Sequence, residues 1–265
     1  MVDPRQGQGA AQVAELVLVR HGESVGNLAA TSAAEQGLAR LDLSYRDPDT
    51  PLSDNGIAQA RALGRHLAQL PTSRHPDVVL SSPYERAAGT MRHAISPWAH
   101  GLRPVYDERL RERDLGVFDG LTGHGIRQAH PEEAQRRAAM GKFYYRPPGG
   151  ESWTDVVLRV RSLVTDVVRE HPERRVWVFT HQAVIMAFRY VLESLSEEDV
   201  LRVDGQTPLG NCSLTRYRPG DDGALRLVSY GSVDHLEPSD AVATHEPPHA
   251  PTDPGDCLLY TSRCV

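Results

Sequence analysis

The stretch AELVLV, residues 14–19, leads directly into the polar sequence RHGESVGN, residues 20–27. A short and nearly continuous apolar run is typical of a strand that is buried on both faces of a parallel sheet. In open parallel sheets, ligands bind outside the carboxyl ends of the strands. The side chains that follow Val19, beginning with Arg20 and His21, are therefore the first candidates for a functional site.

Similar apolar runs alternate with helical patterns along the rest of the chain. Strands are expected at 77–80, 104–107, 175–179, 213–218 and 225–229. Helices are expected at 53–70, at 83–95, at 152–169 and after residue 181. Residues 28–51 are expected to form a long polar connection that contains one weakly helical piece. This alternation predicts an α/β domain with helices on both faces of the sheet.

The composition supports a globular protein and excludes several classes of partner. The chain has 265 residues, of which 40% are hydrophobic and 24% are charged, a balance that supports a buried core. Its 29 basic and 35 acidic residues leave a formal net charge of −6, so bulk electrostatics favours neither nucleic acid nor an anionic membrane. No apolar run approaches the roughly 20 residues that span a bilayer, and the start lacks the layout of a signal peptide. We therefore expect a cytoplasmic protein with no nucleic-acid or membrane partner.

The two ends of the chain differ in composition from the part between them. Residues 1–12 are rich in Gly and Gln and are expected to be a flexible head. Residues 237–265 combine five prolines with little apolar periodicity, which predicts a disordered tail. The last stretch, CLLYTSRCV, resembles translated vector sequence and carries no functional weight. A single domain is thus expected over residues 13–236.

Polar segments follow three of the expected strands. They are Arg20-His21, the segment from Ser81 to Arg86, and Thr180-His181-Gln182. If these strands are neighbours in a parallel sheet, their carboxyl ends meet at one edge, and two arginines and two histidines converge. Guanidinium groups present paired donors, and this set suits a dianionic phosphate. A neutral histidine at such a site can also attack phosphorus and form a covalent intermediate.

The joint pattern resembles the histidine phosphatase superfamily, also called phosphoglycerate mutase-like. The resemblance covers about residues 15–190, in the family's order. The matching segments are LVLVRHGESVGN (16–27), PLSDNGIAQA (51–60), VVLSSPYERAAGT (78–90), RLRERDLGVFDGLT (109–122), GGESW (149–153) and VFTHQAV (178–184). The resemblance implies a three-layer α/β/α sandwich whose sheet is mostly parallel with one antiparallel strand.

The same resemblance assigns roles to the residues of the predicted pocket. It implies that His21 is the nucleophile that becomes phosphohistidine, and that Arg20, Arg86 and His181 complete the phosphate pocket. The RHGESVGN motif also carries two residues with an implied role in substrate binding, Ser24 and Asn27, and Asn27 is expected to contribute a side-chain donor.

Glu112, in the segment Arg-Glu-Arg-Asp-Leu-Gly, matches the family's proton donor. Chemistry requires an acid there, because an alkoxide departs slowly unless it is protonated as the P–O bond breaks. The alternative interpretation of Glu112 is an ion pair with Arg111 or Arg113. No metal and no cofactor is implied, since arginine and histidine supply the positive charge, and the histidines and cysteines show no zinc-binding spacing.

Two subclasses differ in the fate of the phosphohistidine. A mutase returns the phosphoryl group to a sugar acid, whereas a phosphatase admits water. Cofactor-dependent mutases resemble this chain in the core but carry a longer insertion between the acid motif and the GES motif. The short interval from Glu112 to Glu151 therefore favours a phosphatase.

Residues 131–182 resemble the fructose-2,6-bisphosphatase branch most closely. In that branch the glutamine at the position of Gln182 contacts the sugar phosphate, and Arg137 and Lys142 fall near positions that bind a second phosphate. The chain departs from that branch at three positions, Met186 in place of an arginine, Trp153 in place of a tyrosine and Gly123 in place of a tyrosine.

These observations favour a phosphomonoesterase that acts on a small phosphorylated metabolite, with sugar phosphates among the candidates, through a phosphohistidine intermediate. One alternative is a phosphoglycerate mutase. The other is a non-catalytic phosphate-binding module on the same fold, which loss of the nucleophile, a pocket arginine or the acid would signal. The chain keeps all of these residues, and its expected partner is a small phosphate ester. The sequence leaves the oligomeric state open.

Overall fold

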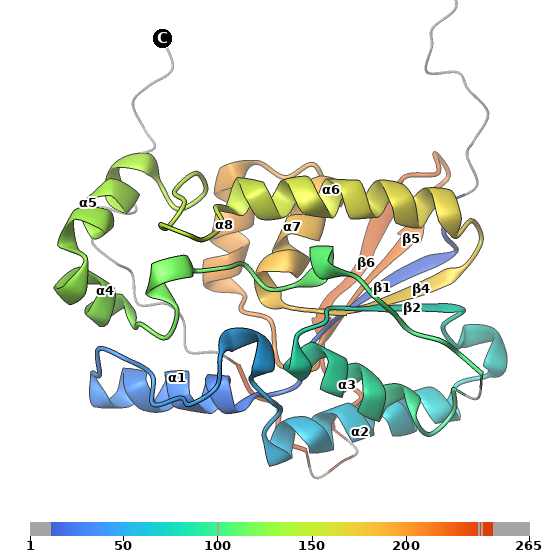
Figure 1. The fold of residues 1–265 in the computed structure, drawn as a ribbon. Coiled ribbons are helices and arrows are strands. Elements are labelled where there is room, and N and C mark those ends of the chain that lie inside the picture. Colours follow the sequence, from blue (N-terminus) through green and yellow to red (C-terminus); the bar gives the residue numbers. More distant parts are fainter. Residues whose placement is uncertain (1–11, 100, 238, 240, 246–265) are drawn as a thin grey trace, which may run out of the picture.

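A six-stranded sheet forms the centre of the computed structural model, which describes residues 12–99, 101–237, 239 and 241–245 (Figure 1). The strands lie in the order β3-β2-β4-β1-β5-β6. Their bounds are β1 Glu15–Arg20, β2 Val78–Ser81, β3 Val105–Tyr106, β4 Arg175–Thr180, β5 Leu214–Pro219 and β6 Leu225–Ser232. β3, β2, β4 and β1 are mutually parallel, and β5 runs antiparallel to both of its neighbours. The predicted sheet, mostly parallel with one antiparallel strand, is confirmed.

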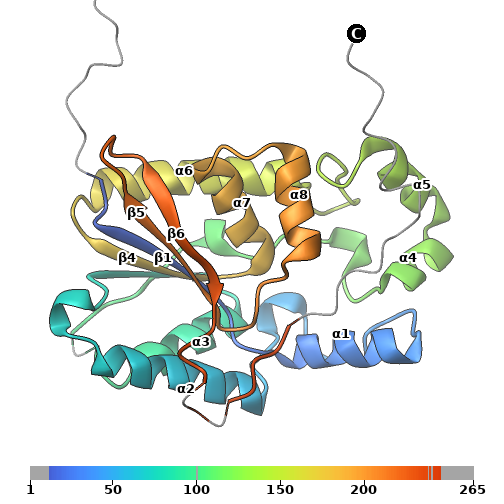
Figure 2. The same cartoon turned by 180° about the vertical axis from the view of Figure 1, so that it is seen from behind.

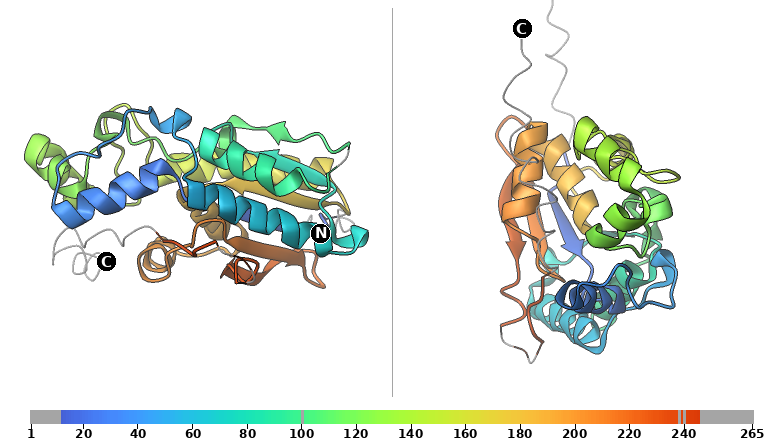
Figure 3. Two further views of the ribbon diagram at one scale, coloured as in Figure 1. Left: turned by 90° about the horizontal axis from the view of Figure 1, so that it is seen from below. Right: turned by 90° about the vertical axis from the view of Figure 1, so that its left-hand side faces the viewer.

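Helices cover both faces of this sheet. Their bounds are α1 Val25–Gln36, α2 Asp54–Gln69, α3 Glu85–Ile95, α4 Gly123–Ala129, α5 Pro131–Met140, α6 Trp153–Glu170, α7 Gln182–Leu192 and α8 Glu197–Gln206. Helices α6, α7 and α8 lie on one face, and α2 and α3 lie on the other, as Figures 1 and 3 show from different sides. The predicted three-layer α/β/α sandwich is confirmed. No helix within the described ranges is long and apolar enough to cross a membrane.

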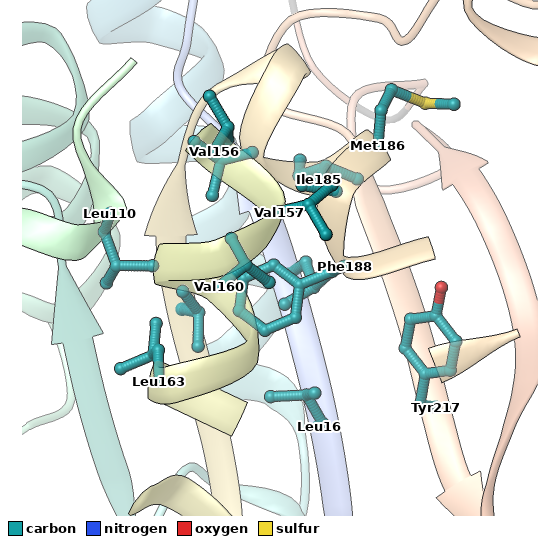
Figure 4. Packing of buried hydrophobic residues seen from close by; sticks show 14 of the residues in the cluster. Leu16, Leu110, Val156, Val157, Val160, Leu163, Ile185, Met186, Phe188 and Tyr217 are labelled. Carbon is teal, nitrogen blue, oxygen red and sulfur yellow. The ribbon is translucent and has the colours of Figure 1, made fainter. Parts of the chain in front are cut away.

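Alternate residues of β1 supply the two halves of the core, because successive side chains of a strand point to opposite faces. Leu16 and Leu18 belong to the cluster built with α6 and α7, part of which Figure 4 shows. Val17 and Val19 belong to the second cluster, built with α2 and α3. All four side chains are at most 1% exposed, so both faces of β1 are dry. This explains why the strand is continuously apolar rather than alternating in the sequence.

Three helices of the structure have no clear signal in the sequence, α4, α5 and α8. Helix α5 buries no residue, so it has no apolar stripe that periodicity could detect. Together with α1, helices α4 and α5 lie beyond the end of the sheet at which β1 leads into α1 (Figure 1). The chain after α1 is fastened to the α4 side by a hydrogen bond of 2.9 Å from Leu41 N to Gly120 O.

The prediction of a disordered tail from residue 237 on is wrong for residues 241–245. Val242 O accepts hydrogen bonds from Asn55 Nδ2 at 3.1 Å and from Gln59 Nε2 at 2.7 Å. Thr244 O accepts a bond of 2.8 Å from Asn211 N. Figure 2 shows the chain after β6 passing beside α2, where these contacts form. Residues 1–11 of the expected flexible head lie outside the described residues. So does the end of the expected tail, from residue 246 on.

Candidate active site

Sheet register brings the three predicted segments together. Arg20 at the end of β1 pairs with Thr180 at the end of β4, and Ser81 at the end of β2 pairs with Phe179 of the same strand. The residues that follow these strands, among them His21 and His181, therefore start from the same edge of the sheet. This convergence was the central prediction from the sequence, and the strand pairing confirms it.

His21 is 3% exposed, and its ring orientation is fixed by the next residue. Its Nδ1 lies 2.7 Å from Gly22 O. A carbonyl oxygen only accepts hydrogen bonds, so Nδ1 carries the proton and Nε2 keeps its lone pair. Burial lowers the pKa of His21 well below its ordinary value, and the positive charges of Arg86 and Arg20 lower it further. The ring is therefore neutral near pH 7 and presents a nucleophilic Nε2.

His181 stands beside His21, with ring centroids 5.2 Å apart and ring planes tilted by 58°. Its side chain is fully buried, and its Nε2 lies 2.9 Å from Ser82 Oγ. Burial lowers the pKa of His181 well below its ordinary value, and Arg86 and His21 lower it further. Two buried, neutral imidazoles thus lie side by side at the carboxyl ends of β1 and β4.

The two arginines of the pocket are buried and held by different partners. Arg20 is fully buried, and its Nη1 donates to Leu209 O. Arg86 is 6% exposed, and its Nη1 donates to Asp47 O at 2.7 Å and pairs with Asp47 Oδ1 at 2.9 Å. The charges of both arginines act on His21, which places all three groups in one electrostatic neighbourhood. Buried arginines of this kind suit the binding of a phosphate dianion.

The loop that carries His21 rests directly on the start of α2. A Cβ on Gly22 would come within 2.7 Å of Gly56 O, and a Cβ on Gly56 would come within 1.9 Å of Glu23 O. Both positions therefore require glycine for the close approach of two backbones. Gly22 N also donates to Thr90 Oγ1 at 2.9 Å. The segments RHG and PLSDNG are thus two halves of one packed turn, which positions the nucleophile.

Ser24 and Asn27 form the N-terminal cap of α1. Ser24 Oγ accepts from Asn27 N at 3.1 Å, and Asn27 Oδ1 accepts from Ser24 N at 3.0 Å, which is a capping box. Asn27 Oδ1 also accepts from Asn211 Nδ2 at 3.2 Å. The oxygen end of Asn27 thus serves the backbone of the cap and the side chain of Asn211. Ser24, by contrast, uses its hydroxyl within the cap.

Glu112 lies in a segment that is tied to the end of β4. Thr180 Oγ1 donates to Leu110 O at 2.8 Å, which places Glu112 two residues beyond that contact. Glu112 Oε1 accepts from Arg113 N at 2.7 Å, and the side chain is half-buried. Arg111 pairs with Glu151 at 2.6 Å, and the charge of Glu112 acts on Arg113, the other partner considered from the sequence.

The three residues that the family resemblance places near a second phosphate make contacts with other side chains of the protein. Gln182 opens α7 immediately after His181, and its Nε2 donates to Asp204 Oδ1 at 3.0 Å. Lys142 Nζ pairs with Asp204 Oδ2 at 2.8 Å and lies 5.6 Å from the ring centroid of Trp153. Arg137 lies on α5, where its charge acts on Arg113. The carboxylate of Asp204 therefore joins Gln182 and Lys142.

Several residues that shape this site carry no signal of their role in the sequence motifs. Asp47 holds Arg86, Ser82 holds His181, and Asn211 donates to Asn27 and, at 3.4 Å, to His21 O. Ser82 lies inside a recognised motif, so its contact could have been suspected from its place after β2. The other two residues are far from their partners in the chain, and no local pattern marks them.

The described residues offer a charged pocket and no metal centre. No group of three or more His, Cys, Asp or Glu side chains in the described ranges is placed to hold a metal ion. The guanidinium groups of Arg20 and Arg86 supply positive charge beside His21. The arrangement can bind a phosphate group and bring a neutral imidazole to it.

The fold thus places two buried histidines and two buried arginines near the carboxyl ends of its parallel strands. Residues 16–232 match the family model of the histidine phosphatase superfamily (branch 1), and the chain therefore belongs to this superfamily. The resemblance drawn from the sequence motifs is thereby confirmed.

Relatives within the superfamily carry different activities. The chain is 34% identical over 216 residues to a 2,3-bisphosphoglycerate-dependent phosphoglycerate mutase of Azorhizobium caulinodans, covering 79% of this chain and 94% of the mutase. It is 36% identical over 188 residues to the mutase of the same name from Methylobacterium radiotolerans, covering 70% and 82% of the two chains. Among solved structures, the vanadate (VO3) complex of a mycobacterial glucosyl-3-phosphoglycerate phosphatase matches with a TM-score of 0.65 and 29% identity, covering 83% of this chain and 100% of that chain.

Proposed function

We propose that this protein is a phosphomonoesterase that acts on a small phosphorylated metabolite through a phosphohistidine on His21, without a metal ion or a cofactor. The observation that carries the proposal is the buried pair of neutral histidines, with ring centroids 5.2 Å apart, beside two buried arginines. Sugar phosphates are among the candidate substrates. The likeness to a mycobacterial phosphatase of 29% identity supports the reaction class.

In the first step, the lone pair of His21 Nε2 attacks phosphorus, and the bond from phosphorus to the ester oxygen breaks. Gly22 O accepts from Nδ1–H and stabilises the positive charge that develops on the ring. Arg20 and Arg86 balance the negative charge on the transferring group. Glu112, in its acid form, gives its proton to the leaving oxygen, so an alcohol departs.

In the second step, water attacks the phosphohistidine. Glu112, now a carboxylate, accepts one proton of that water while the N–P bond breaks. The products are inorganic phosphate and neutral His21, and Glu112 regains its acid form. Dividing one difficult transfer into two easier steps is the advantage of a covalent intermediate.

Phosphoglycerate mutase is the second candidate function, because the chain is 34% identical to a mutase over 94% of that mutase's length. Such extensive alignment leaves little room for a long insertion in this relative. The short interval from Glu112 to Glu151, which favours a phosphatase by resemblance, therefore does not separate the two activities by itself. Assay of the products is required.

The first test measures phosphate release and the covalent intermediate. Wild-type protein with p-nitrophenyl phosphate in EDTA should release phosphate, and an alkaline quench should retain acid-labile phosphate on the protein. His21→Ala should abolish both signals. His93→Ala, a half-buried histidine on α3, is the matched control and should retain both. Unchanged turnover in His21→Ala would exclude the covalent mechanism.

A second test separates the three candidate functions by their products. The protein is incubated with 3-phosphoglycerate, with and without 2,3-bisphosphoglycerate. Conversion to 2-phosphoglycerate identifies a mutase, whereas free phosphate from esters in a metabolite panel identifies a phosphatase. Binding of phosphate or vanadate without any product identifies a non-catalytic module and overturns the proposal.

A further inference from the structure

Asp204 on α8 lies between two residues that the family resemblance connects with a second phosphate. Its Oδ2 is 2.8 Å from Lys142 Nζ, and its Oδ1 accepts a hydrogen bond of 3.0 Å from Gln182 Nε2. The Asp204 side chain is 6% exposed, so water screens these contacts poorly. One carboxylate thus engages both the ammonium group and the amide donor that a second phosphate would need.

This cluster adjoins the phosphate pocket. Gln182 directly follows His181, whose ring stands beside His21. Arg113, the residue after Glu112, feels the charge of Asp204 as well as that of Glu112. The group of a substrate that extends beyond the transferred phosphate in this direction therefore meets Asp204 and its partners.

The next turn of α7 adds no positive charge to this region. Met186 follows Gln182 by four residues, so it lies on the same side of the helix. Its side chain is fully buried in the core cluster, and its sulfur lies 3.6 Å from Tyr230 Oη. The position at which the bisphosphatase branch has an arginine is here part of the hydrophobic core.

We propose that Asp204 is a specificity-determining residue that makes this subsite accept an uncharged, hydroxyl-bearing group and reject a second phosphate or carboxylate. The proposal rests on the proposed phosphatase function. Asp204 balances the charge of Lys142 and accepts from one N–H of Gln182, so an anionic group entering here would face the Asp204 carboxylate beside a lysine whose charge is already neutralised. A hydroxyl group both donates and accepts, and it suits a carboxylate–ammonium pair.

The test uses two esters that differ in one group. Glycerol 3-phosphate and 3-phosphoglycerate share the phosphate and the neighbouring hydroxyl, but the first ends in CH₂OH and the second in a carboxylate. The wild-type protein should hydrolyse glycerol 3-phosphate with the higher kcat/KM. Asp204→Asn should shift the ratio of the two kcat/KM values toward 3-phosphoglycerate by about tenfold or more, mainly through KM, because it removes a negative charge and leaves Lys142 positive.

Two further variants show whether the shift comes from the Lys142 charge. Asp204→Asn combined with Lys142→Gln should return the ratio to near the wild-type value. Asp199→Asn, on the same helix, removes an exposed carboxylate that pairs with Arg202, and it should leave the ratio unchanged. Thermal melting of each variant checks that the fold is retained.

Calorimetric binding of the same two esters in a His21→Ala background separates this proposal from the proposed function. If no ester is hydrolysed but Asp204→Asn still shifts the binding ratio, the phosphatase function fails and the specificity role stands. If phosphate is released but Asp204→Asn changes both esters equally or neither, the phosphatase function stands and the specificity role of Asp204 is overturned.

Discussion

Asp47 Oδ1 lies 2.9 Å from Arg86 Nη1, and the two side chains differ in exposure, at 36% for Asp47 and 7% for Arg86. The backbone carbonyl of Asp47 also accepts from the same nitrogen at 2.7 Å. Asp47 belongs to the long connection at 28–51, which motifs in the sequence could not interpret. The contact shows that this connection sets the orientation and the electrostatic surroundings of a pocket arginine.

Asp47→Asn should tighten the binding of orthovanadate, a mimic of the transferred phosphate. The variant removes a negative charge next to Arg86 but keeps the backbone carbonyl that orients the guanidinium. We expect dissociation constants lower by several-fold to about tenfold, measured by calorimetry. Asp49→Asn is the matched control, since Asp49 pairs with Arg46 at the surface. Weaker binding in Asp47→Asn would mean that the carboxylate mainly holds Arg86 in place.

Arg86→Ala should affect the rate more than the binding of substrate. Arg86 is expected to face charge that develops during phosphoryl transfer, so kcat should fall by about 10²–10³, on the scale of one lost oxyanion donor. Steady-state kinetics with p-nitrophenyl phosphate measures this. Arg92→Ala, which removes an exposed arginine of the same helix, should leave kcat within about twofold, as for a change at the surface. A rise in KM alone for Arg86→Ala would contradict a role in the transition state.

Glu112→Gln should slow esters according to their leaving groups. A proton donor matters most when the leaving oxygen is basic, so alkyl phosphates should lose far more rate than p-nitrophenyl phosphate. The ratio of kcat/KM values for glycerol 3-phosphate and p-nitrophenyl phosphate is the measurement, and Glu108→Gln, an exposed carboxylate in the same segment, is the control. Equal losses on both esters would assign Glu112 a structural role.

The parts of the fold that the sequence predicted are those with a strong local signal. Strand β1 is apolar throughout because both of its faces are buried, and α6 shows a continuous apolar stripe because it covers the sheet. Helix α5 buries nothing, so its sequence has no such stripe. The motifs at the strand ends could be placed together because parallel strands align their carboxyl ends.

The contacts that tune the pocket could not be predicted, because they join positions far apart in the chain. Gln182 and Asp204 are 22 residues apart, and Lys142 and Asp204 are 62 apart. The packing of α8 against α7 brings Asp204 to Gln182, and the segment between α5 and α6 brings Lys142 to the same carboxylate. Lys142 could thus be placed near a phosphate-binding position, but its neutralising partner could not be found from spacing.

Lowering the pH should destabilise the fold through His235, a buried histidine near His66. Burial lowers its pKa to about 4, with further contributions from His66 and Arg216. Below its ordinary pKa, the unfolded chain binds a proton that the folded chain excludes, so stability is lost as pH falls from about 6.5 toward 4, by roughly 3 kcal/mol at most. Urea unfolding at pH 7.5 and 5 should show a smaller loss in His235→Gln than in wild type. His124→Gln, exposed on α4, should behave as wild type; an unchanged pH dependence in His235→Gln would contradict the assignment.

Residues 241–245 are connected to the nucleophile loop through two buried amides. Gln59 Nε2 donates to Val242 O at 2.7 Å, while its Oε1 accepts from Glu23 N at 2.8 Å. Asn211 is bonded to Thr244 at both its backbone nitrogen and its side-chain oxygen, and its Nδ2 donates to Asn27 Oδ1. Residues 241–245 therefore complete the hydrogen bonding of Gln59 and Asn211, which contact the RHGESVGN motif.

Truncation after residue 240 should consequently lower both stability and turnover, whereas truncation after residue 245 should change neither. The shorter chain leaves Gln59 and Asn211, at most 1% exposed in the intact structure, without their partners at Val242 and Thr244. Each unsatisfied buried group costs about 1–3 kcal/mol, which corresponds to a fall of several degrees in Tm for a domain of this size. Because the same amides orient the nucleophile loop, kcat should also fall while KM changes less.

Differential scanning calorimetry and steady-state kinetics on the two truncated chains measure both effects. The longer truncated chain serves as the matched control, and equal Tm and kcat for the two would show that the segment neither stabilises the fold nor positions the loop.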